Sequence, residues 1–288
     1  MACGGSFSAI LTKPSPTDLI ESGSREYAAG AWDAARALYE AAFRGSVAAG
    51  DRDTLLEAIT RLGHCLREAG DIDAAHDVLA LAATVAALAC DHVRAARALN
   101  GIGILYQYAG EIEQAERTYL QARDHALEIN YEPALGELEQ NLGILDNIRG
   151  DLPAALAHYL AGLQYLTNAG HTRGRARALN NLGMIHVDIG ELQKADGYFQ
   201  EALQLCEEVG DVVTAGTIHI NRAEMYLALG EPDRARASCD EGFEIASRLN
   251  DHPRRGEALK FYGIIYRETG KLHLAEIHLD QAIEIARG

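Results

Sequence analysis

The sequence has no surplus of positive charge, no long apolar run, and few prolines or aromatic residues. Its 288 residues carry 26 lysines and arginines against 42 aspartates and glutamates, which gives a formal net charge of −16. A protein that binds nucleic acid through its phosphates needs a basic surface, so this composition argues against a nucleic-acid partner. No stretch approaches the roughly 18 apolar residues of a membrane-spanning helix. We therefore predict no membrane association.

The N-terminus and the cysteines also lack the features of a secreted protein. Residues 1–14 have neither the charged start nor the apolar core of a secretory signal, and we interpret them as a flexible tail. The five cysteines are odd in number, irregularly spaced and contain no CxxC pair. Reduced thiols in a cytoplasmic protein are the simplest interpretation.

What the sequence does contain is a repeat with a period of forty residues. Glycine recurs in phase along the whole chain, and an alanine follows each of these glycines five residues later. The glycines are Gly30, Gly70, Gly110, Gly150, Gly190, Gly230 and Gly270, and the alanines are Ala35, Ala75, Ala115, Ala155, Ala195, Ala235 and Ala275. Another glycine stands seven residues before most of them, as Gly183 does before Gly190. Several sets in one phase, without an insertion, indicate an array of structural repeats.

A second set of turn residues falls midway through each repeat. It reads GD at 50–51, CD at 90–91, NY at 130–131, GH at 170–171, GD at 210–211 and ND at 250–251. Glycine and asparagine accept the left-handed conformation that ends a helix, and aspartate caps the start of the next one. Each repeat is therefore predicted to be a pair of helices, for example 52–69 and 71–89. Seven such pairs fill residues 15–288 as a single array without a linker.

The motif within each repeat resembles the tetratricopeptide repeat. In the fifth repeat the matching residues are Leu182, Gly183, Gly190, Ala195, Phe199 and Ala202. The resemblance implies an all-α fold, a right-handed superhelical solenoid of seven antiparallel helix pairs. Forty-residue versions with similar turns look like those of spindle-orientation adaptors and of bacterial regulator and sensor proteins.

The physical chemistry of the motif agrees with this resemblance. Gly183 and Ala195 are small because the two helices of a repeat cross closely there, and a larger side chain would overpack at a cost of about 1–3 kcal/mol. Phe199 is expected to fill the space that they leave. The sixth repeat departs from the motif, with Ala223 in place of the glycine and Cys239 in place of the aromatic residue.

The motifs of enzymes and metal sites are missing. The sequence has no HExxH, no GxxxxGK and no GxSxG, and the GIG at 101–103 lies within an expected helix. Cys65 follows His64, but adjacent helix residues point about 100° apart and cannot readily pair. His186 occupies the position of a tyrosine in other repeats, so we expect a packed side chain. We predict no enzyme activity, no cofactor and no metal.

A candidate partner site lies on the first helix of each repeat. In tetratricopeptide proteins the face opposite the buried one lines a concave groove, so the resemblance implies a binding surface there. Carboxamides both donate and accept hydrogen bonds and can satisfy the backbone of an extended peptide, while an exposed apolar strip usually marks an interaction. The predicted groove residues are the carboxamides Asn100, Gln140, Asn141, Asn180, Asn181 and Asn221, the apolar Ile104, Ile144 and Met184, and the flanking Arg97 and Arg177.

These features predict a non-enzymatic scaffold that binds a peptide or protein segment. One alternative is the N-terminal sensor or regulatory module of a larger bacterial signalling or transcription protein. Another is self-assembly through an uncovered apolar surface at the C-terminal repeat. A structural alternative also stays open, in which the groove residues pack on one another within the array.

Overall fold

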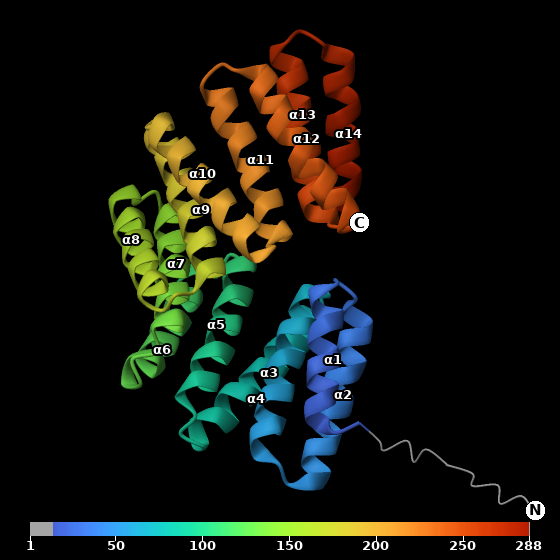
Figure 1. The fold of residues 1–288 in the computed structure, drawn as a ribbon, viewed down its shortest axis with the longest axis vertical. Helices are drawn as coiled ribbons and strands as arrows, with labels where there is room; N and C mark the ends of the chain where they lie inside the picture. The colour runs from blue at the N-terminus through green and yellow to red at the C-terminus, as the bar shows by residue number, and fades with distance from the viewer. Residues whose placement is uncertain (1–13, 288) are drawn as a thin grey trace, which may run out of the picture. The chain divides into compact units, whose positions relative to one another are not determined.

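The structure, a computed structural model, describes residues 14–287. These residues form fourteen α-helices joined by short turns, with no strand among them (Figure 1). The all-α fold of paired helices is therefore confirmed. The tail predicted at residues 1–14 lies outside the described residues, apart from Pro14.

First and second helices of the pairs alternate along the chain with the predicted period of forty residues. The first helices of the pairs are α1 (Pro16–Ala28), α3 (Arg52–Glu68), α5 (His92–Tyr108), α7 (Glu132–Arg149), α9 (Thr172–Ile189), α11 (Val212–Ala228) and α13 (His252–Glu268). The second helices are α2 (Trp32–Ala49), α4 (Ile72–Leu88), α6 (Ile112–Glu128), α8 (Leu152–Asn168), α10 (Leu192–Val209), α12 (Pro232–Arg248) and α14 (Leu272–Arg287). The helices predicted at 52–69 and 71–89 thus have their boundaries placed to within one residue.

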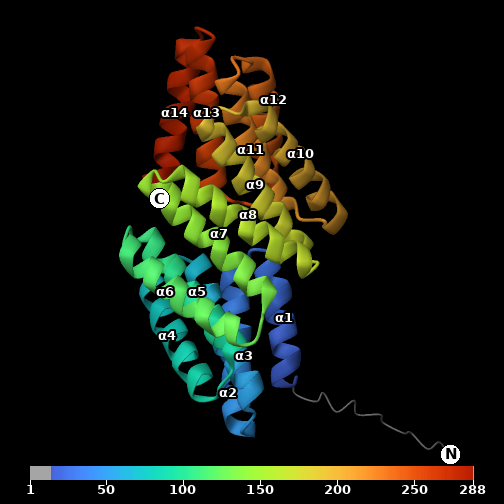
Figure 2. The ribbon, with the colours of Figure 1, turned by 90° about the vertical axis from the view of Figure 1, so that its left-hand side faces the viewer.

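The chain divides into two compact units, residues 1–105 and 106–288. In the first unit, α2 packs against α1 and α3, and α3 packs against α4. In the second unit, each of α7, α9, α11 and α13 packs against the helix that follows it (Figures 1 and 2). The same four helices also contact one another in turn, α7 with α9, α9 with α11, and α11 with α13. One side of the second unit is therefore formed by first helices alone.

Residues in the left-handed backbone conformation, with positive φ, end the helices as the turn pattern predicts. Gly190, in the turn within a repeat, has φ of 85°. In the turns between repeats, Gly210, Asn130 and Asn250 have φ of 65°, 50° and 56°. The next helix is then capped by a side chain, since Asp211 accepts a hydrogen bond from the backbone N–H of Thr214 at 3.2 Å. These turns have the conformation that orphan carbonyls and N–H groups at helix ends require.

Cys90 is the one described turn residue with a positive φ, 55°, that is neither glycine nor asparagine. The left-handed conformation costs a residue with a Cβ about 1–2 kcal/mol. We expect Cys90→Gly to raise the free energy of unfolding by about 0.5–1 kcal/mol, after the extra entropy of glycine in the unfolded chain. Urea unfolding followed by circular dichroism measures this. Cys90→Ala, which keeps the Cβ, is the control, and an equal gain from both variants would refute the explanation.

The close crossing of the two helices in a repeat is confirmed at the motif glycines. A Cβ added to Gly183 would lie 2.4 Å from Cε1 of Phe199, and one added to Gly143 would lie 2.7 Å from the ring of Tyr159. Phe199 and Ala195 are fully buried. The ring on the second helix therefore occupies the space where the first helix has no side chain.

The irregular sixth repeat preserves this contact with a different pair of residues. Ala223 supplies the methyl group that Gly183 lacks, and the facing residue is the smaller Cys239 instead of a phenylalanine. Both Ala223 and Cys239 are fully buried. The Cys239 thiol donates a hydrogen bond to the carbonyl of Ala258 at 3.2 Å. The two departures from the motif thus change the side-chain volumes in opposite directions.

These opposite changes predict a coupling between the same two positions in the fifth repeat. Gly183→Ala should destabilise the protein by about 1–3 kcal/mol through overpacking, and Phe199→Cys should destabilise it by leaving a cavity. We expect the free energy of unfolding of the double variant to exceed the additive expectation. Its loss should be smaller than the sum of the two single losses by at least about 0.5 kcal/mol. Equilibrium unfolding of all four proteins measures the coupling, and strictly additive losses would contradict it.

Candidate partner-binding site

Seven partly exposed side chains lie in two in-phase rows on the first helices of the second unit. One row contains carboxamides and the other is mostly apolar. We call these residues the first-helix face: Asn141, Asn181 and Asn221 in one row, and Ile144, Met184, Glu224 and Ile264 in the other. The rows exist because positions forty residues apart occupy the same place on successive first helices.

Two hydrogen bonds between predicted carboxamides join neighbouring repeats. The amide of Asn181 on α9 donates to Oε1 of Gln140 on α7 at 3.0 Å, and Asn221 on α11 donates to Oδ1 of Asn180 on α9 at 2.8 Å. Gln140 also donates to the carbonyl of Tyr159 at 2.9 Å. Gln140 and Asn180 are only 7% and 9% exposed. For these two residues the alternative holds, because their side chains pack within the array and not on its surface.

The two partly exposed partners in these bonds keep unused hydrogen-bonding capacity. Asn181 and Asn221 each donate one N–H to the buried carboxamide on the preceding first helix. A primary carboxamide has a second N–H and a carbonyl oxygen that accepts. Each side chain is thus fixed by one bond and presents a donor and an acceptor to a ligand.

A similar in-phase contact involves charges. Arg177 on α9 donates to Glu137 on α7 at 3.0 Å, with 55% and 37% of the two side chains exposed. An exposed ion pair of this kind contributes roughly 0.2–1 kcal/mol. Arg177 therefore already has a carboxylate partner, and its role in partner binding stays a prediction.

The remaining predicted residues belong to the first unit. Arg97, Asn100 and Ile104 lie on α5, where Arg97 is exposed and the other two are partly exposed. They are not part of the first-helix face defined above, and their role in partner binding stays a prediction.

Glu224 interrupts the apolar row, a feature that the sequence reasoning missed. It occupies the position of Ile144, Met184 and Ile264 in the other repeats of the unit. The forty-residue phase places it there unambiguously, so extending the row by one more repeat would have found it. A single carboxylate therefore lies in a row of apolar side chains.

Burial and charges of both signs act on Glu224. Burial raises the pKa of its carboxyl group, and the charges of Asp188 and Glu257 raise it further, whereas Lys260 lowers it. Within residues 14–287, Glu224 has neither a hydrogen bond nor an ion pair. The Lys260 ammonium lies 4.5 Å from the centre of the Phe261 ring. The carboxylate is thus partly desolvated and unpaired.

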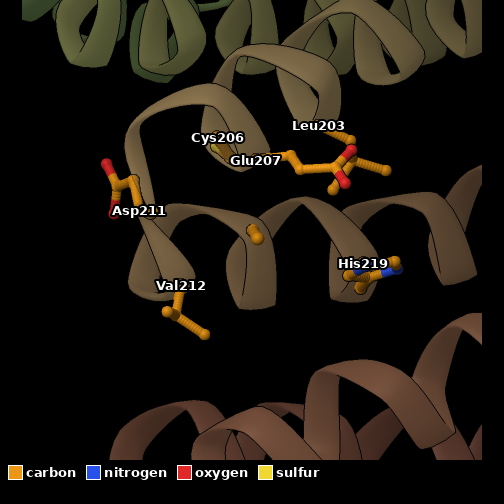
Figure 3. Close-up of a pocket in the computed structure, with 8 residues that line it drawn as sticks. Leu203, Cys206, Glu207, Asp211, Val212 and His219 are labelled. Atoms are coloured by element: carbon orange, nitrogen blue, oxygen red, sulfur yellow. The ribbon is translucent and has the colours of Figure 1, made fainter.

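A cleft of ≈ 330 Å³ lies elsewhere in the second unit, between α10 and α11. Figure 3 shows Leu203, Cys206 and Glu207 on one helix, Val212 and His219 on the other, and Asp211 at the turn between them. Ala215 and Gly210 complete the lining.

The cleft is explained by a small residue and has no activated nucleophile. Ala215 stands where α7, α9 and α13 carry Leu135, Arg175 and Arg255, so a long side chain is missing. Burial raises the pKa of the Cys206 thiol to about 11. The thiol is therefore neutral near pH 7, and a neutral thiol is a poor nucleophile.

His186 is a packed side chain, as predicted from its position in the repeat. His186 is 6% exposed, its Nδ1 lies 2.8 Å from Glu191, and its ring stacks on Tyr198 with centroids 5.3 Å apart. Cys65 also makes a structural contact, since its thiol donates to the carbonyl of Trp32 at 3.3 Å. Across the described residues, no group of three or more histidine, cysteine, aspartate or glutamate side chains is placed to hold a metal ion.

The four cysteines of the described region, Cys65, Cys90, Cys206 and Cys239, are free thiols. No helix in residues 14–287 combines the length and the apolar character that crossing a membrane requires.

Comparison with protein families confirms the class. A tetratricopeptide repeat model matches residues 135–208 and 214–288, together just over half of the chain. The protein therefore belongs to the tetratricopeptide repeat family. No curated protein sequence matches the chain.

Solved structures show the same fold at low sequence identity. A Rap protein complexed with competence and sporulation factor is 14% identical, with 94% of this chain and 74% of that chain covered and a TM-score of 0.77. The Rap conjugation gene regulator of plasmid pLS20, in complex with the Phr* peptide, is 15% identical, with 98% and 79% covered and a TM-score of 0.76. Aspartyl phosphate phosphatase F from Bacillus subtilis is 13% identical, with 95% and 70% covered and a TM-score of 0.73. At these identities the likeness concerns the fold alone.

The in-phase bonds predict unequal effects of two substitutions. Gln140→Met keeps the size of the side chain but leaves the amide of Asn181 and the carbonyl of Tyr159 without their partner, so we expect a loss of about 1–3 kcal/mol in unfolding free energy. Arg177→Met removes the exposed pair with Glu137 and should change stability by less than about 1 kcal/mol. Urea unfolding measures both changes. Equal effects would show that the hydrogen bonds of Gln140 contribute no more to stability than the exposed ion pair.

Proposed function

We propose that the first-helix face binds an extended peptide or an unfolded segment of a protein, without enzymatic action. The observation that carries this is the pairing of two rows: Ile144 and Met184 are apolar and partly exposed, and Asn181 and Asn221 beside them keep a free donor and acceptor. Apolar side chains of the segment would contact the first row, and its backbone would bond to the second.

The fixed carboxamides favour this function energetically. A flexible side chain loses about 0.5–1.5 kcal/mol of rotamer entropy when a ligand immobilises it. Asn181 and Asn221 are already held by Gln140 and Asn180. Less entropy is therefore lost when they bind a backbone, and a row of pre-oriented amides recognises main chain irrespective of side-chain sequence.

Proteins of similar fold support the class of partner. One neighbour was solved in complex with the Phr* peptide and another with competence and sporulation factor. The neighbour with the Phr* peptide is a conjugation gene regulator, which favours a regulatory setting for peptide binding as the second candidate. The free thiols fit a reducing compartment, and we place the interaction in the cytoplasm.

Self-association through α14 is a further candidate. Leu272 and Ile283 on this helix are 66% and 46% exposed. Leu279 is partly exposed, although the in-phase Phe199 and Cys239 are fully buried. Apolar exposure of this kind favours contact with another helix.

A binding experiment tests the proposed function. A random peptide library displayed on phage is selected on the immobilised protein, and the enriched peptides are synthesised and titrated by calorimetry. Replacing both Ile144 and Met184 by glutamine should weaken binding at least about tenfold, equivalent to about 1.4 kcal/mol, because the apolar contacts are lost while helix propensity is kept.

Ala215→Leu, which fills the cleft between α10 and α11, is the matched control and should leave the affinity unchanged. Light scattering of the free protein at the same concentration identifies any association between copies. The proposal is wrong if no peptide is enriched, or if the double glutamine variant binds as tightly as the wild type.

A further inference from the structure

The apolar row of the first-helix face is continuous except at one position. Met184 on α9 and Ile264 on α13 flank Glu224 on α11, and α11 contacts both of these helices. Met184 and Ile264 pack at the edge of the same buried core. A ligand that follows the row therefore meets an apolar side chain, a carboxylate and another apolar side chain in that order.

No hydrogen bond or ion pair within the described residues compensates the charge of Glu224. Removing a carboxylate from water costs free energy unless a charge or hydrogen bond replaces the lost solvation. Isoleucine or methionine at this position, as in the neighbouring repeats, would extend the row without that cost. Folding alone therefore does not explain the choice of glutamate.

The charges around this position favour a cation. Asp188 and Glu257 act on Glu224 with the same sign, and Lys260 is the one basic side chain that acts on it. Asp188 and Glu257 are exposed, so they attract a cation from solvent, while the partly buried Glu224 can form the shorter contact. An opposite charge brought to a partly desolvated carboxylate is more stabilising than one in open water.

We propose that the bound segment carries one lysine or arginine that pairs with Glu224, between two apolar side chains that contact Met184 and Ile264. This rests on the proposed function and specifies its partner. The shape of these side chains fits the row, because lysine and arginine have long aliphatic stems that lie along apolar surface while the charged end reaches a polar group. An arginine would form two parallel hydrogen bonds with the carboxylate, and a lysine would form one.

The test uses the full chain and the random displayed peptide library as the probe. Selections on the wild type, on Glu224→Gln and on Glu224→Lys are sequenced in parallel. Peptides from the wild type should be enriched in lysine and arginine next to aliphatic residues. This enrichment should disappear with Glu224→Gln, and Glu224→Lys should favour aspartate or glutamate instead. Circular dichroism and thermal melting establish that each variant is folded.

Affinities of one enriched peptide give the quantitative result. Glu224→Gln should weaken its binding about tenfold or more, and replacing the basic residue of the peptide by norleucine should weaken wild-type binding to the same extent but have little further effect on the variant. Glu208→Gln, on the exposed side of α10, makes the same change in net charge away from the face and should change the affinity less than twofold.

The outcomes separate this inference from the function on which it rests. Peptides that depend on Met184 but show no basic residue, or that bind Glu224→Gln as well as the wild type, overturn the pairing and leave peptide binding intact. A selection without any enriched peptide overturns both. Equal weakening by Glu224→Gln and Glu208→Gln shows a general effect of net charge and also overturns the pairing.

Discussion

The rest of the structure depends on one constraint, the close crossing of the two helices in each repeat. Gly183 has no side chain where Phe199 lies, and an added Cβ would be 2.4 Å from the ring. Because this contact fixes how each pair packs, successive first helices lie next to one another and bring in-phase residues together. The rows of the first-helix face are a consequence of that packing. In the sixth repeat the same two positions hold Ala223 and Cys239, a larger residue on the first helix and a smaller one on the second.

Much of the fold could be predicted from the sequence, because each residue type of the repeat motif has few structural roles. Most repeats have two glycines seven residues apart and, in several turns, an aspartate at the start of the next helix. Each of these residues meets one backbone or packing requirement. The packing of His186 could be predicted because three in-phase residues, Tyr106, Tyr226 and Tyr266, are tyrosines. Such predictions depend only on local conformation and on contacts within one repeat.

The candidate site was less predictable, because it depends on contacts between repeats. A rotation of 100° per residue places Asn180 and Asn181 on neighbouring parts of the helix surface. It does not show that Asn180 is buried against the next repeat while Asn181 stays partly exposed. It also does not show the bond that Asn180 accepts from Asn221, forty-one residues away on the next first helix. Glu224, by contrast, is within reach of sequence reasoning, because it lies forty residues after Met184 in the same row.

The bonds between carboxamides have a consequence for how the second unit unfolds. In repeat proteins the stability is approximately a sum of the stability of each repeat and of the interfaces between neighbours. Gln140–Asn181 and Asn180–Asn221 strengthen two consecutive interfaces, and each bond is lost if either repeat opens. The three pairs from α7 to α12 are therefore linked in sequence by these bonds. Opening of the middle pair, α9 and α10, would break both of them.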